Sequence, residues 1–131
     1  MKFMLLMQGS QAGWESMGGW PKADLDAHIR FMGRLAERLA ATGELVSAEG
    51  LDLPSTAKIV RSKNGEVVIT DGPFPESKEF LAGFWLVDVA SEARAIAIAS
   101  EASEAPGPGG APQGIPIEVR RLGTTPEVDD A

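Results

Sequence analysis

Hydrophobic and polar positions change period several times along the chain, and each change predicts an element. An apolar run at residues 2–8 has the length of a β-strand, whereas residues 22–42 place apolar side chains at helical spacing along one face. Between them, residues 9–21 contain four glycines and a proline, so we expect a loop there. This loop contains Trp14 and Trp20, which can serve either as apolar anchors or as a lid over a ligand.

The clearest local signal predicts a β-hairpin. Residues 57–62 and 66–70 are rich in β-branched side chains, and Asn64 and Gly65 lie between them. Asn-Gly is preferred in type I′ turns because both central residues need a positive φ. We therefore expect two antiparallel strands joined by this tight turn.

The rest of the chain predicts three further strands and a second helix. We expect strands at residues 44–49, 79–88 and 115–122, and a helix at 92–102. Residues 103–114 are rich in Pro, Gly and Ala and predict an irregular connection. The order is strand–helix–strand, hairpin, strand–helix–strand. It is typical of a ferredoxin-like, split βαβ α+β fold, with two helices on one face of an antiparallel sheet.

Two of the predicted strands are apolar on both faces. Phe84 and Leu86 alternate with Trp85 and Val87 in one of them, and the first strand is apolar almost throughout. A sheet covered on one face normally alternates apolar and polar residues, and monomers rarely expose large apolar patches. We therefore expect two subunits to pair through their sheets as a homodimer. The alternative is that the loops before the first helix and after the second fold over this face.

Composition narrows the classes of function. A chain of 131 residues suits one domain, which we place at residues 1–122, followed by a C-terminal tail at 123–131. The net charge of −7 and the scattered Lys and Arg residues argue against nucleic acid or a membrane surface as partner. With no cysteine, one histidine and no phosphate-binding glycine motif, we expect neither a metal nor a cofactor. The short opening apolar run is no signal peptide, so the cytoplasm is the expected location.

The segment at residues 71–79 has an unusual composition for a loop: Asp-Gly-Pro-Phe-Pro-Glu-Ser-Lys-Glu. Gly72 and Pro73 force a sharp bend directly after a predicted strand. Asp71 should therefore lie at a strand end, where its carboxylate can face a cleft. Phe74 would anchor the loop.

These residues resemble the DGPF signature of the YCII-related family. Other stretches agree with the family, and they lie at residues 2–7, 43–46, 49–51 and 83–85. The resemblance covers residues 1–122. The chain departs from the family pattern at 101–114, where the usual connection into the last strand is shorter and contains less Ala, Gly and Pro.

The resemblance implies a dimeric α/β barrel built from ferredoxin-like subunits. It implies less about activity, because the family is largely uncharacterised. Some members are suspected enzymes with a His–Asp pair in a cleft, and a relative acts in chloroaromatic breakdown. DGPF members are often encoded beside, or fused to, bacterial extracytoplasmic-function sigma factors.

His28 is the only histidine, and it lies within the apolar stripe of the first helix. One interpretation is a hydrogen-bonded packing residue. The functional interpretation pairs it with Asp71, which would orient the imidazole and make His28 a general acid or base. Asp71 can instead bond the backbone amides of its own turn.

Two functions therefore remain open. The first is an enzyme acting on a compact small molecule, which needs His28 and Asp71 within hydrogen-bond reach in an accessible pocket. The second is a non-catalytic dimeric module that binds a ligand or serves a sigma-factor system, which predicts a pocket with aromatic walls and no positioned proton donor. In either case, we assign the ligand cleft to a short set of residues: Glu49, Gly72, Pro73, Phe74 and Trp85.

Overall fold

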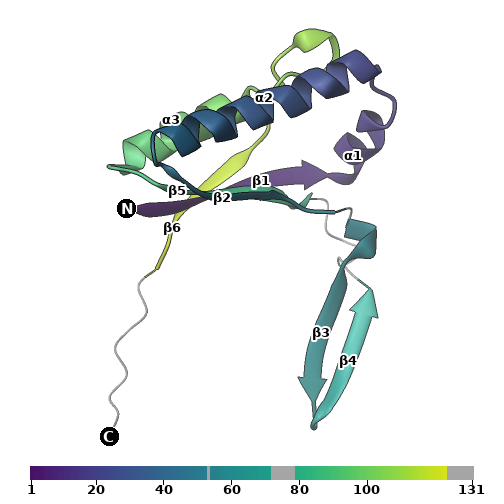
Figure 1. Cartoon of the computed structure of the whole chain (residues 1–131). Helices are drawn as coiled ribbons and strands as arrows, with labels where there is room; N and C mark the ends of the chain where they lie inside the picture. The colour runs from purple at the N-terminus through teal and green to yellow at the C-terminus, as the bar shows by residue number, and fades with distance from the viewer. Residues whose placement is uncertain (53, 72–78, 124–131) are drawn as a thin grey trace, which may run out of the picture.

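The computed structural model describes residues 1–52, 54–71 and 79–123, and for Gln11 and Trp14 it describes the backbone alone. Within these ranges, a sheet lies beneath a layer of helices, and a separate hairpin extends from one end of the sheet (Figure 1). Residues 72–74, which carry most of the DGPF signature, lie outside the described part of the chain.

The sheet has four antiparallel strands in the order β2-β5-β1-β6. Their bounds are β1 Lys2–Ser10, β2 Leu45–Gly50, β5 Glu79–Asp88 and β6 Ile117–Arg121. This order places the two central strands next to each other although most of the chain separates them. It confirms the predicted ferredoxin-like α+β fold with an antiparallel sheet.

Two long helices, α2 (Lys22–Ala41) and α3 (Glu92–Ser103), cover one face of the sheet (Figure 1). The Ser91 hydroxyl caps α3 by accepting a hydrogen bond from the backbone amide of Arg94 at 3.2 Å. Along the described residues, no helix is both long enough and apolar enough to span a bilayer.

The loop predicted at residues 9–21 is wrong at residues 9–17. Strand β1 continues to Ser10, and α1 (Gln11–Met17) follows directly. The Ser10 hydroxyl caps this helix by accepting a hydrogen bond from the amide of Gly13 at 3.0 Å. A helix of two turns is too short to show an apolar period, so the glycines dominated the sequence pattern.

The hairpin pairs β3 (Lys58–Lys63) with β4 (Glu66–Asp71) in a two-stranded sheet of its own. Asn64 and Gly65 have φ values of 53° and 78°, so the predicted turn with two positive φ angles is confirmed. Figure 1 shows the hairpin pointing away from the sheet, on the side opposite the helices. Two short 3₁₀ helices complete the connections, η1 (Pro54–Thr56) and η2 (Pro108–Gly110).

The buried core occupies one half of the space between helices and sheet. There the C-terminal half of α2 and the whole of α3 pack on the two central strands. Its largest fully buried side chains are Leu5, Leu35, Val87 and Ile98. Small residues on α3 allow this helix to lie close to the sheet, and they are Ala95, Ala99 and Ala102.

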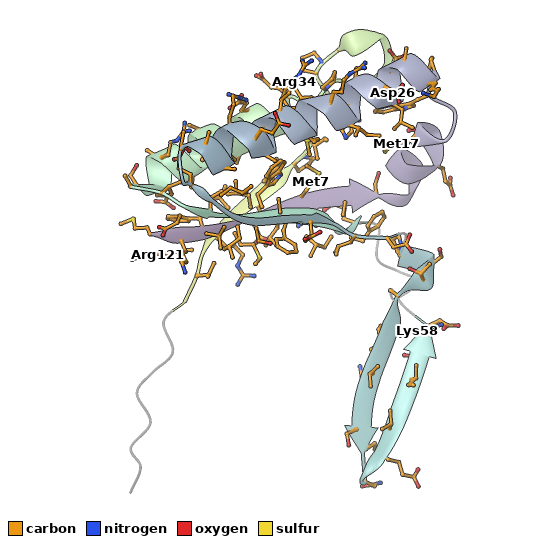
Figure 2. All side chains as sticks on the ribbon, viewed as in Figure 1. Met7, Met17, Asp26, Arg34, Lys58 and Arg121 are labelled. Atoms are coloured by element: carbon orange, nitrogen blue, oxygen red, sulfur yellow. The ribbon has the colours of Figure 1, made fainter. Side chains whose placement is uncertain are left out.

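The other face of the sheet carries apolar side chains that none of the helices in the described residues covers. Leu5 pairs with Trp85 in the layer beneath the helices, so the neighbouring pair of Leu6 and Phe84 turns to the opposite side. We call Met4, Leu6, Phe84 and Leu86 the open face. Figure 2 shows side chains projecting from this side of the sheet. The prediction of a sheet that is apolar on both faces is confirmed.

The segments proposed as alternative covers of the open face lie elsewhere. Helix α1 follows β1 on the helical side of the sheet, below one end of α2 (Figure 1). Helix η2 contacts α2, and the amide of Gly109 donates to the carboxylate of Asp24 at 3.3 Å. Both segments therefore extend the helical layer.

Candidate functional site: a cavity between α2 and the sheet

A cavity of about 620 Å³ lies between the middle of α2 and the sheet. It is bordered by the second half of β1, the end of β2 and the first half of β5, together with residues 113–116 and part of α1. The buried core fills the other half of the same layer. The cavity therefore begins where the packing of α3 against the sheet ends.

Small residues explain why this half of the layer is hollow. Gly50 and Gly83 border the cavity on adjacent strands, and alanines border it on α2, β2 and β5. A Cβ atom at Gly83 would lie 2.8 Å from the carbonyl oxygen of Glu49, so β2 and β5 approach closely here. With these short side chains, neither α2 nor the sheet reaches across the space.

The cavity walls are mostly apolar. Met7, Met17 and Met32 come from β1, α1 and α2, and Trp85 adds an aromatic side chain that is only 5% exposed. Figure 2 shows Met7 and Met17 in the space between the sheet and α2. Methionine is flexible and polarisable, so three methionines around one cavity can adapt to ligands of different shape.

His28 is the titratable side chain that α2 contributes to the cavity, and its orientation is well defined. Its Nδ1 lies 3.2 Å from the carbonyl oxygen of Pro106. Since a carbonyl only accepts, Nδ1 carries the proton in this contact, which leaves Nε2 for another partner. Trp20 packs edge-to-face on the imidazole, with ring centroids 5.9 Å apart. His28 is thus partly a packing residue and partly a polar group at the cavity wall.

A few other polar residues border the cavity. Gln8 and Gln113 are among them, and the Ser10 hydroxyl is engaged in capping α1. Glu49 also borders it, but Glu49 pairs with Phe84, so its exposed side chain turns toward the open face. In the described residues, no three His, Asp or Glu side chains cluster closely enough to hold a metal ion.

Asp71 lies apart from the cavity, at the end of β4. Its carboxylate forms an ion pair with the Lys58 ammonium, and its side chain is 82% exposed. The described cavity lining does not include Asp71, so the chain by itself does not bring His28 and Asp71 together. The hairpin register could have revealed this partner, because a turn at Asn64 and Gly65 places Lys58 opposite Asp71.

Of the predicted cleft residues, two border the cavity and three lie outside the described part of the chain. Glu49 and Trp85 both border the cavity. Gly72, Pro73 and Phe74 lie outside the described residues. The sequence pattern did not identify the methionines or Gly83 as cavity residues. A cavity forms where the side chains of two facing elements are too short to touch, and this depends on the tertiary structure.

The best-defined electrostatic contact lies at the other end of the sheet. Glu44 accepts two hydrogen bonds from the Arg94 guanidinium, each at 2.9 Å, and one from the Thr42 hydroxyl at 2.8 Å. The hydrogen bonds from Arg94 have the largest effect, and the bond from Thr42 adds to it. Together they lower the pKa of Glu44 to about 2. The same carboxylate raises the pKa of Arg94. This pair connects the start of β2 to the first turn of α3 and has no part in the cavity.

Comparison of the sequence with known proteins identifies its family. A model of the YCII-related domain matches residues 1–108. The chain belongs to the YCII-related family. An uncharacterized protein of Rhizobium meliloti (strain 1021) is 30% identical over 107 residues, which cover 82% of this chain and 86% of that protein. In this YCII-related protein, the matched residues supply most of the cavity lining, and residues 113–116 lie beyond them.

Proposed function

We propose that this YCII-related protein binds a compact, predominantly apolar small molecule in the cavity between α2 and the sheet. The observation that carries the proposal is the cavity itself. Its volume of about 620 Å³ falls within the range of about 300–1,000 Å³ that is usual for ligand sites. Such sites combine apolar walls with a few fixed polar groups, and the methionines, Trp85 and His28 provide both.

The packing around the cavity supports the proposal that a ligand occupies it. The cavity is partly open to solvent, and it leaves apolar surface uncovered next to a close-packed core. Here an apolar hollow adjoins a core whose central side chains are fully buried. A ligand would supply the contacts that the small residues leave unmade.

His28 is the expected polar anchor of the ligand. With Nδ1 bonded to Pro106, the neutral imidazole offers Nε2 as an acceptor. We therefore expect a ligand with one hydroxyl, amide or similar donor on an otherwise apolar body.

Acid–base catalysis at His28 is the second candidate, favoured by the same fixed imidazole. The Pro106 carbonyl holds the ring in one tautomer, which is the orienting role that the sequence had assigned to Asp71. A substrate whose turnover is lost in His28→Gln, while its binding is retained, would establish this function. Loss of binding alone would leave His28 as an anchor.

Methionine methyl signals provide a direct test of binding. The chain has five methionines, and Met7, Met17 and Met32 border the cavity whereas Met1 and Met4 do not. We expect small aromatic and branched aliphatic alcohols to shift the first three ¹³C-methyl signals in NMR titrations and to leave the other two in place. Shifts of all five, or of Met4 alone, would contradict binding in the cavity.

Two alanines on α2 form a matched pair for this titration. Ala36 borders the cavity, whereas Ala40 is exposed. Ala36→Leu should fill part of the hollow and weaken binding of the same alcohols by at least about tenfold, the equivalent of 1.4 kcal/mol. Ala40→Leu should leave their affinity unchanged. Equal affinities in the two variants would contradict the site.

We further propose that the protein is a homodimer that pairs through its open face. The apolar centre of Met4, Leu6, Phe84 and Leu86 supports this. The flanking strands place charges of both signs around it, with Glu118 opposite Leu6 and Arg120 opposite Met4. An apolar centre with a charged rim is typical of protein interfaces.

A further inference from the structure

Within the described part of the chain, the β3–β4 hairpin is an arm that packs on no other strand or helix through an extended contact. Its strands form a sheet separate from the four-stranded one, and every residue of these strands except Ile59 is exposed. Figure 1 shows it extending from the sheet on the side of the open face. A two-stranded hairpin by itself is at best marginally stable in water. This arm therefore needs a surface to pack against.

One face of the arm is apolar. Residues directly opposite each other in a hairpin share a face, and the register pairs Val60 with Ile69 and Ser62 with Val67. Val60, Val67 and Ile69 therefore lie together, with exposed fractions of 61%, 70% and 61%. We call these three residues the arm face. Contiguous exposed β-branched side chains of this kind mark interaction surfaces.

The charge of the arm differs from that of the remaining chain. Residues 58–71 contain three basic and two acidic side chains, a net charge of +1. Since the whole chain carries −7, the remainder carries −8. A basic arm on an acidic body is electrostatically complementary to the body of a second copy.

The length of the arm also suits a second copy of this chain as its partner. Six residues per strand extend about 20 Å at about 3.4 Å per residue, whereas packed sheets lie about 10 Å apart. A second sheet stacked on the open face would lie beside the arm. The arm would then pass the edge of that sheet and reach the helical layer behind it.

We propose that the β3–β4 hairpin is an intersubunit arm, whose Val60, Val67 and Ile69 face packs on the second copy of this chain. The proposal rests on the homodimer proposed above and adds a contact that face-to-face sheets do not make by themselves. Each subunit contributes one arm, because a twofold dimer makes every contact twice. The cavity of the same subunit lies on the opposite side of the sheet, so the arm does not border the cavity of its own subunit.

Threonine substitutions test the arm face without changing charge or strand propensity. In the full-length protein, Val60→Thr/Val67→Thr/Ile69→Thr should raise the dimer dissociation constant at least tenfold in analytical ultracentrifugation. The matched control is Ile59→Thr/Val68→Thr on the other face of the same hairpin, which should change it less than twofold. A triple variant that dimerises as tightly as the wild type would overturn the arm face as the contact.

A mixed sample shows directly whether the arm reaches the second copy. The chain has no cysteine, so Lys63→Cys near the tip can carry a single nitroxide label. Labelled, unenriched chains are mixed with unlabelled chains that carry ¹³C-methyl methionine. We expect broadening of one or more methionine signals, which can arise only between subunits. A dimer without broadening would overturn the arm alone, and a monomeric wild type would overturn the dimer together with the arm.

Discussion

At Gly83, strand β5 comes so close to β2 that a side chain has no room. A Cβ atom there would lie 2.8 Å from the carbonyl oxygen of Glu49 and 3.2 Å from the Cα of Gly50. These are backbone atoms of a paired strand, which cannot rotate away as the end of a side chain can. The same glycine borders the cavity, so one residue sets both the strand approach and the width of the hollow.

Gly83→Ala should therefore destabilise the protein. Because the added methyl group must displace β2, we expect a loss of roughly 1–3 kcal/mol in the free energy of unfolding, measured by urea denaturation. The matched control is Gly33→Ala on α2, where a Cβ meets nothing within 4 Å. A glycine removed from a helix interior should raise stability by about 0.5–1 kcal/mol. Equal changes in the two variants would contradict the close approach at Gly83.

Among the elements, those with a clear period could be predicted from the sequence, and α1 could not. The strands, the two long helices and the hairpin turn follow from spacing, capping and the Asn-Gly pair. Helix α1 has seven residues and depends on one side-chain cap at Ser10, which apolar spacing does not reveal. The cavity could not be predicted either. It depends on how far α3 extends over the sheet and on which small residues face each other across two elements.

The Glu44–Arg94 pair should make the connection between β2 and α3 dependent on pH. The pKa of Glu44 falls from 4.5 to about 2 on folding. A lowered pKa means that the contribution to stability is complete above pH 4.5 and is lost as the pH falls toward 2. We expect Arg94→Met to have a lower Tm than the wild type at pH 6, and the difference to shrink by pH 2.5.

Arg34→Met is the control for this prediction. Arg34 is exposed on the outer side of α2, away from the sheet (Figure 2). Its Tm difference from the wild type should stay constant over the same pH range. A difference for Arg94→Met that also stays constant would show that the pair has no role in the acid dependence.

For the whole molecule, the proposed dimer depends on the open face. We expect the wild type to be a dimer by size-exclusion chromatography with light scattering at micromolar concentration. Leu6→Lys places a charge at the centre of the open face and should yield a monomer, because burying an unpaired ammonium is costly. Ile96→Lys on the exposed side of α3 is the matched control and should stay dimeric. A wild type that is monomeric at this concentration would refute the dimer.

The space between the helices and the sheet also differs from one end to the other. Tight packing of alanines and branched side chains is confined to one end, and the hollow lies at the other. Met32, Ala36 and Ala48 border the hollow and also pack against the buried core, whereas Met7 and Met17 border the hollow alone. Substitutions at Met7 and Met17 should therefore leave the core packing untouched. If the proposed ligand site is correct, relatives could change at such positions and bind different ligands without losing stability. An engineer could likewise reshape this end for a new compound while the opposite end keeps the protein folded.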